Sequence, residues 1–319
     1  MTNAVYHVRL LNVLPPHPGF ILRVYGSNAD LIISRVREML WLERLSASGV
    51  GSTMLGTFEN GRVEAYLPSH TLTDIDIRIP ETSRTIAREM RRLHDLISLY
   101  PPGLTDREGG ERALEWRRCV DAWLPEVIKV IHSSHSSGFL SQQQVDLLDL
   151  PSLSPLISQY RAIAHNHPSG TVVSHNDVQY GNILRLDKDH SIVLVDFEYA
   201  GYNPKTYDIA NHFNEWTADY YGPTPHLLNE AKYPSREERL NFLLAYTQGN
   251  SQEALLLEDL IPIWRTASHL FWGLWGLLQT GRDDVADFDY FAYGLGRIQQ
   301  FRFAVRSLLE KDGLNDSGE

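Results

Sequence analysis

The sequence contains almost no cysteine and no long apolar segment. Cys119 is the only cysteine in 319 residues, so an intrachain disulfide and a zinc site built on thiolates are both excluded. The most apolar stretch, residues 270–278, is too short to cross a bilayer. The N-terminal segment MTNAVYHVRL lacks the basic patch and apolar core of a secretory signal. Together these absences predict a cytoplasmic protein.

Positive charge is also scarce. The chain carries 29 Lys and Arg against 40 Asp and Glu, which gives a formal net charge of −11. An acidic field of this size disfavours nucleic acid and anionic membrane surfaces as partners. The 43% of apolar residues and 22% of charged residues are instead typical of a folded globular chain. The length corresponds to about two domains.

Four short apolar runs in the N-terminal part predict β-strands, over residues 4–11, 20–25, 54–58 and 62–66. The last two flank Asn60-Gly61, the dipeptide most typical of a tight hairpin turn. A helical period over residues 30–47 places one helix between the two pairs of strands. We therefore expect a small, β-rich lobe over residues 1–67.

Helical patterns dominate the rest of the chain. Helices are predicted over residues 80–99, 112–131 and from Pro204 onward. Pro125 is expected to break the second of them, and residues 132–138 are predicted to form a loop. Short apolar runs predict strands at 171–174, 183–186 and 192–195, the last two paired as a hairpin. The expected fold class is α+β, with a larger, mostly helical lobe over residues 68–319.

A polar segment between these strands has the residue pattern of a phosphoryl-transfer site. His175-x-Asp177-x₄-Asn182 has the spacing of a kinase catalytic loop, and Asp196 follows at the end of the next hairpin. In such a loop Asp177 can accept the proton of an attacking hydroxyl group, while Asn182 and Asp196 offer oxygen ligands to Mg²⁺. The alternative is a polar loop before a buried strand, in which these side chains only make turn hydrogen bonds.

A basic residue interrupts one of the N-terminal strands. Arg23 lies in the apolar run ILRVYG, where a protein kinase has its phosphate-binding lysine, and Glu38 on the following helix could pair with it. A fixed guanidinium group is chemically suited to hold nucleotide phosphates. The alternative is an edge-strand arginine with an unrelated, exposed glutamate.

Four aromatic residues repeat at helical spacing in the C-terminal part: Trp272 with Trp275, and Tyr290 with Tyr293. Pairs of this kind most often pack in a core. A site for a permanent cation, however, needs aromatic faces and a nearby carboxylate, which Glu215 could supply. Because they cluster with Glu215 and the kinase pattern, we expect Trp272, Trp275 and Tyr293 to line a cation site, whereas core packing and cation binding stay evenly open for Tyr290.

The runs SHNDVQYGNIL and LVDFEYAGYNPKTYDIANHFNEW, together with FILRVYG, GTFENGRVEAYLPSHTL and HLFWGLWGLLQ, resemble the choline/ethanolamine kinase family, fungal-type choline kinases most of all. The resemblance covers nearly the whole chain. It implies a protein-kinase-like, two-lobe fold within the aminoglycoside-phosphotransferase group. It also implies transfer of phosphate from ATP, with Mg²⁺, to the hydroxyl group of choline, which gives phosphocholine for phospholipid synthesis.

The resemblance also implies roles for individual residues. The catalytic group would comprise Asp177, Gln179 and Asn182, and the metal ligands Asn182, Asp196 and Glu198. Nucleotide binding would involve Thr2, Asn3, Arg23, Glu38, Glu64, Tyr66 and Leu67. The substrate pocket would comprise Asp177, Glu215, Tyr220, Trp272, Trp275, Tyr290 and Tyr293. Asp208 is expected to brace the catalytic loop rather than to take part in the reaction.

One departure from the family concerns the phosphate-covering loop. In the family this loop carries glycine before a Thr-Asn pair, which Thr2-Asn3 match here, so the first lobe is expected to be truncated at its start. The departure keeps a catalytically impaired, kinase-like binding protein open as an alternative, beside an ethanolamine kinase. An aminoglycoside kinase is disfavoured because a polycationic sugar would need several more carboxylates. The oligomeric state, a homodimer included, stays open.

Overall fold

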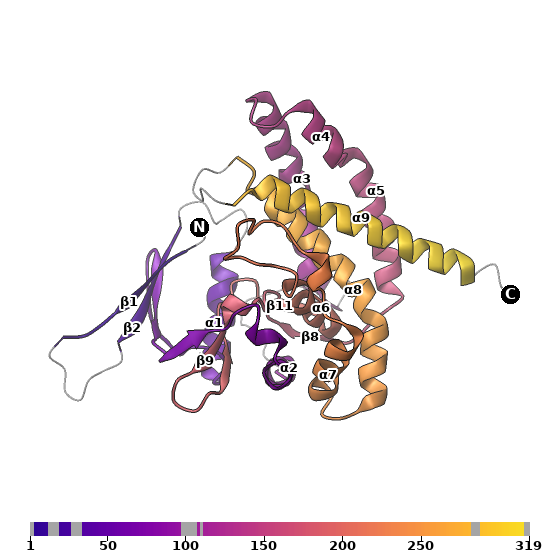
Figure 1. The fold of residues 1–319 in the computed structure, drawn as a ribbon. Helices are drawn as coiled ribbons and strands as arrows, with labels where there is room; N and C mark the ends of the chain where they lie inside the picture. The colour runs from indigo at the N-terminus through magenta and orange to yellow at the C-terminus, as the bar shows by residue number, and fades with distance from the viewer. Residues whose placement is uncertain are drawn as a thin grey trace.

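The protein combines a small antiparallel sheet with a larger helical body (Figure 1), which confirms the predicted α+β class. The structure is a computed structural model and describes residues 3–11, 19–26, 34–96, 107–108, 111–281 and 288–315. Within these ranges, no helix has the length and apolar character needed to cross a membrane.

The N-terminal part forms a four-stranded sheet of order β1-β2-β4-β3. Its elements are β1 (Asn3–Val8), β2 (Phe20–Tyr25), α1 (Arg35–Ala47), β3 (Met54–Phe58) and β4 (Gly61–Ala65). All neighbouring strands are antiparallel, and the register places Arg23 on β2 directly opposite Arg62 on β4. The predicted strands and the hairpin are confirmed. Residues 30–33 of the predicted helix lie outside the described residues.

The remaining strands are short. They are β5 (Ser69–Thr71), β6 (Arg107–Glu108), β7 (Glu111–Arg112), β8 (Thr171–Ser174), β9 (Ile183–Leu186), β10 (Ile192–Leu194) and β11 (Gly201–Pro204). β9 pairs with β10 as predicted, and also with β5, whereas β11 pairs with β8. The polar segment identified in the sequence is thereby held between two small sheets.

Helices form the body of the second part of the chain. They are η1 (Asp76–Arg78), α2 (Pro80–His94), α3 (Glu115–Ser136), α4 (Gln142–Leu148), α5 (Leu150–His165), η2 (Tyr180–Asn182), α6 (Lys205–Glu215), η3 (Glu230–Lys232), α7 (Arg236–Tyr246), α8 (Ser251–Leu278) and α9 (Tyr290–Asn315). The core is centred on α8, which packs against α3, α6, α7 and α9. Figure 1 shows α9 lying across this helical body.

Helix α3 continues through Pro125, so the break predicted there is wrong, and the loop predicted over residues 132–138 begins only after Ser136. Proline cannot donate to the carbonyl group one turn earlier, at Asp121. Both Pro125 and Asp121 are exposed, so water can satisfy that carbonyl. The buried ring of Trp123 packs 4.7 Å from Phe271 of α8 and holds this part of the helix in place.

Candidate active site

One buried carboxylate, that of Asp208, holds the loop that follows β8. Asp208 on α6 accepts hydrogen bonds from the backbone N–H groups of His175 (2.9 Å) and Asn176 (2.8 Å). The ring of His94 lies 2.9 Å from the same carboxylate. Burial alone would raise the pKa of Asp208, but the hydrogen bonds and charge of its partners outweigh burial and lower it. The predicted bracing role of Asp208 is therefore confirmed.

The loop brings Asp177 and Asn182 into contact. The Asn182 side-chain amide donates to Asp177 Oδ2 at 2.8 Å and to the Asp177 carbonyl oxygen at 2.9 Å. Burial raises the pKa of Asp177 well above its usual range, and the charges of Glu215, Glu198 and Asp196 add to this effect. A raised pKa makes a carboxylate a stronger proton acceptor once it is ionised, which is the property that a general base requires.

Gln179 lies two residues after Asp177, but its side chain is occupied within the loop. Its Oε1 accepts a hydrogen bond from Gly181 N at 2.7 Å and caps the short helix η2. The geometry therefore gives Gln179 a role in shaping the turn that carries Asn182. A direct part in catalysis for Gln179 stays a prediction.

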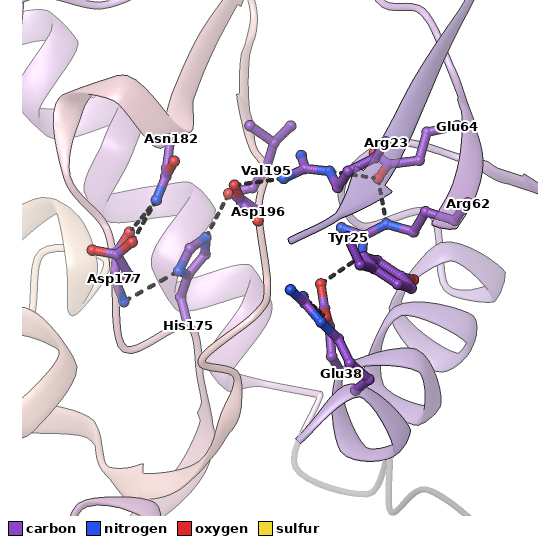
Figure 2. A network of polar contacts seen from close by, with 11 residues as sticks. Arg23, Tyr25, Glu38, Arg62, Glu64, His175, Asp177, Asn182, Val195 and Asp196 are labelled. Carbon is purple, nitrogen blue, oxygen red and sulfur yellow. Dashed lines mark hydrogen bonds and ion pairs between the residues drawn. The ribbon is translucent and has the colours of Figure 1, made fainter. Parts of the chain in front are cut away.

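Asp196 lies between the two parts of the chain (Figure 2). It follows β10 with a φ of 67°, a left-handed conformation that is uncommon outside glycine. Its Oδ2 accepts a hydrogen bond from Arg23 at 2.9 Å, while its buried Oδ1 has no hydrogen-bond partner among the residues that the structure describes. One side-chain oxygen each of Asp196, Glu198 and Glu38 lie within 4.8 Å of one another. This group of carboxylates is suited to a divalent cation.

The electrostatics of this cluster support cation binding. Burial raises the pKa of Glu198 to about 8, and the neighbouring charges of Asp196 and Glu38 contribute. Like charges at this spacing oppose each other's ionisation, and a divalent cation relieves that repulsion. Asp196 and Glu198 were predicted to be metal ligands, whereas Glu38 was predicted to take part in nucleotide binding.

The ion pair predicted between Arg23 and Glu38 is not the one that forms. Glu38 Oε1 accepts from Arg62 Nη1 at 2.5 Å, while Arg23 reaches Asp196 and lies 3.4 Å from Glu64 (Figure 2). Arg23 and Arg62 are cross-strand neighbours, and Arg62 is the one that faces Glu38. Arg62 was not predicted from the sequence because strands β2 and β4 are far apart in the sequence, so no local pattern reveals their register.

The other residues predicted to bind the nucleotide lie in or near the four-stranded sheet. Glu64 accepts from Arg62 Nε at 2.6 Å and thus connects both arginines. The ring of Tyr66 stacks on His7 at 3.8 Å, and the Leu67 carbonyl oxygen accepts from Ser69. Thr2 and the side chain of Asn3 lie outside the described residues.

The predicted aromatic residues come together where α8 and α9 meet. The ring of Trp275 lies 5.4 Å from that of Trp272 and 5.9 Å from those of Tyr290 and Tyr293. Trp272 and Tyr293 are buried, whereas Trp275 is partly exposed. Trp275 Nε1 donates to the Tyr199 hydroxyl group at 2.7 Å. Tyr199 directly follows Glu198 in the DFEY segment, but it was not among the residues predicted for the site.

Glu215 does not present a free carboxylate to this aromatic cluster. Its Oε1 accepts from Arg297 Nη2 at 2.9 Å, and its Oε2 accepts from the Tyr220 hydroxyl group. Arg297 is fully buried on α9, and its guanidinium group lies 5.2 Å from the ring of Tyr293. Arg297 is the only charged residue from position 290 to position 301 of the sequence. This isolated charge is the feature that could have indicated a buried arginine with a carboxylate partner.

Comparison with known proteins gives a consistent result. The family model "Choline/ethanolamine kinase" matches residues 1–302. "Probable choline kinase 3" of Arabidopsis thaliana is 37% identical over 295 residues, which cover 91% of this chain and 79% of the relative. The "Choline kinase" of Saccharomyces cerevisiae is 32% identical, over 88% of this chain and 57% of the relative. The expected fungal similarity is thus present, but it is weaker than that to the plant protein.

A solved structure has the same fold. A Plasmodium vivax ethanolamine kinase superposes with a TM-score of 0.79 at 26% identity, and the match covers 94% of this chain and 80% of that one. Relatives named for choline and for ethanolamine are therefore both similar to this chain.

Proposed function

The chain belongs to the choline/ethanolamine kinase family, and from this premise we propose that it transfers the γ-phosphoryl group of ATP to the hydroxyl group of choline. The products are phosphocholine, used for phospholipid synthesis, and ADP. The observation that carries the proposal is the convergence of Asp177, Asn182 and Asp196 at one site in a chain that matches the family model over residues 1–302.

In this mechanism Asp177 acts as the general base. The choline oxygen attacks the γ-phosphorus in line with the bond to the β-phosphate oxygen, that bond breaks, and Asp177 accepts the hydroxyl proton. The raised pKa of Asp177 favours its role as proton acceptor, and Asn182 holds its carboxylate in position. The Asp208 carboxylate holds the backbone of this loop at His175 and Asn176.

The carboxylates of Asp196 and Glu198, with the side-chain oxygen of Asn182, are our candidates to hold Mg²⁺. The unpartnered Oδ1 of Asp196 and the nearby Glu38 carboxylate support this assignment. When bound, the ion would neutralise charge on the phosphates. We assign residues 1–67 to nucleotide binding, with Arg23 and Arg62 as the cations that face this region.

Choline is favoured over ethanolamine by the charge balance of the pocket. Each oxygen of Glu215 already accepts one hydrogen bond, one from Arg297 and one from Tyr220, and the charge of Arg297 balances that of the carboxylate. A primary ammonium group needs free acceptors for its N–H groups, whereas a quaternary ammonium group needs aromatic faces. The rings of Trp275 and Tyr293 supply such faces. Ethanolamine is the second candidate because the similar Plasmodium vivax protein is an ethanolamine kinase.

Steady-state kinetics with the two substrates test the proposal. We expect kcat/KM for choline to exceed that for ethanolamine at least about tenfold, the scale of one binding difference of 1.4 kcal/mol. A higher value for ethanolamine would overturn the choline preference. Absence of transfer to both alcohols would overturn the kinase assignment and favour the binding-protein alternative.

We also place the protein in the cytoplasm, a location that its single cysteine supports.

A further inference from the structure

A cavity of about 390 Å³ lies between α8 and α9, farther along the same helix pair than the aromatic cluster. This volume is within the usual range for small-molecule sites. Its wall includes the side chains of Glu230, Arg265, His269, Phe303, Leu308 and Lys311. None of the residues assigned above to catalysis, metal, nucleotide or substrate lines it, so it is separate from the proposed active site.

A buried histidine in this wall lacks a hydrogen-bond partner. His269 is 2% exposed, and its Nδ1 makes no hydrogen bond within the described part of the chain. An unpaired polar atom at this depth costs about 1–3 kcal/mol unless a ligand or water satisfies it. His269 is part of the cavity wall, so a ligand in the cavity is the partner that we consider for this atom.

The electrostatic surroundings of His269 are positive. Burial lowers the pKa of the His269 ring well below its usual range, and the charges of Arg297 and Arg265 lower it further. Arg265 is paired with Glu230 at 2.5 Å, but Lys311 has no ion-pair partner among the described residues. Among the residues that line the cavity, the positive charges of Arg265 and Lys311 outweigh the negative charge of Glu230, which favours an anionic ligand.

The rest of the wall is partly apolar. Phe303 is 73% exposed, which is unusual for a phenylalanine, and Leu308 lies five residues farther along α9. We propose that this cavity binds a small organic anion, with the anionic group at His269 and Lys311 and a short apolar chain against Phe303 and Leu308. No residue assigned above to the kinase reaction is needed for this binding.

A titration of the full-length protein with hexanoate tests the proposal. The protein is labelled with ¹³C-histidine, and the His269 ring signal is assigned among the 13 histidines as the one absent from His269→Gln. We expect hexanoate to shift this signal in a saturable manner. Inorganic phosphate should bind at least about threefold more weakly because it lacks an apolar chain, and tetramethylammonium should not shift the signal.

Two variants on the exposed side of α9 separate a specific site from general charge attraction. Lys311→Gln should weaken hexanoate binding at least threefold, since it removes the unpaired cation of the wall. The matched control Arg306→Gln removes an exposed cation of the same helix outside the cavity wall and should change the affinity by less than about 1.5-fold. The proposal is overturned if hexanoate gives no saturable shift, if both variants weaken binding equally, or if phosphate binds as tightly as hexanoate.

Discussion

The Trp275→Phe variant tests whether the aromatic rings between α8 and α9 bind a cation or only pack in the core. Trp275 is partly exposed, and its ring is surrounded by those of Trp272, Tyr290 and Tyr293 at 5.4–5.9 Å. Phenylalanine preserves most of the volume but offers a weaker π face. Since a desolvated cation–π contact contributes up to about 2 kcal/mol, we expect a loss of about 1 kcal/mol in choline affinity. This corresponds to a roughly fivefold rise in the KM for choline.

Trp272 was also predicted to line the substrate pocket, but its buried position in the structure makes Trp272→Phe the matched control for core packing on the same helix. Trp272 is 5% exposed, and its Nε1 donates to the buried Asn211 Oδ1 at 2.7 Å. The same substitution here removes core volume and a buried hydrogen bond, at a cost of about 2–3 kcal/mol of folding free energy. We therefore expect this variant to lower the melting temperature by about 4 °C or more.

The assay combines the melting temperature with the KM values for choline and for ATP in each variant. Because Trp275→Phe also removes the hydrogen bond to the Tyr199 hydroxyl group, cation binding predicts a protein that melts no lower than the Trp272→Phe variant, with a raised KM for choline alone. A lowered melting temperature with an unchanged KM for choline would assign Trp275 to the core. That result would refute the reasoning and leave the substrate undetermined.

Three further predictions concern the catalytic loop, the metal and pH. Asp177→Ala should fold normally but lower kcat at least ~10²-fold, the scale of one general base; kcat within about threefold of wild type would exclude that role. Asp196→Asn should abolish most activity because one anionic metal ligand is lost; equal activity in EDTA and in Mg²⁺ would contradict it. Burial lowers the pKa of His212 to about 4 in the folded protein. As the pH decreases, His212 therefore becomes protonated in the unfolded chain before it does in the folded protein. The free energy of unfolding should fall by up to about 3 kcal/mol between pH 6.5 and pH 4. Denaturant titrations should show a flatter pH dependence for His212→Gln.

Local patterns in the sequence were sufficient for much of the fold and for the catalytic loop. The Asn60-Gly61 turn and the spacing from Asp177 to Asn182 depend only on nearby residues, and both are found as predicted. The helix through Pro125 was missed because its continuity depends on the packing of Trp123 against another helix.

The parts of the site that were missed depend on long-range pairing. Arg62 faces Glu38 because of the register between β2 and β4, which no local pattern specifies. Arg297 neutralises Glu215 because α9 lies against the end of α6 in three dimensions. Both arginines are buried counter-charges, and their partners are separated from them by 24 and 82 residues.

The most direct test of the central claim is to follow the phosphorus of ATP. Purified protein is incubated with ATP, Mg²⁺ and choline, and the products are quantified by ³¹P NMR beside the Asp177→Ala variant. We predict that phosphocholine and ADP accumulate in equal amounts with the wild type and that neither accumulates appreciably with the variant. Release of inorganic phosphate and ADP without phosphocholine, or equal phosphocholine formation by the variant, would contradict the account.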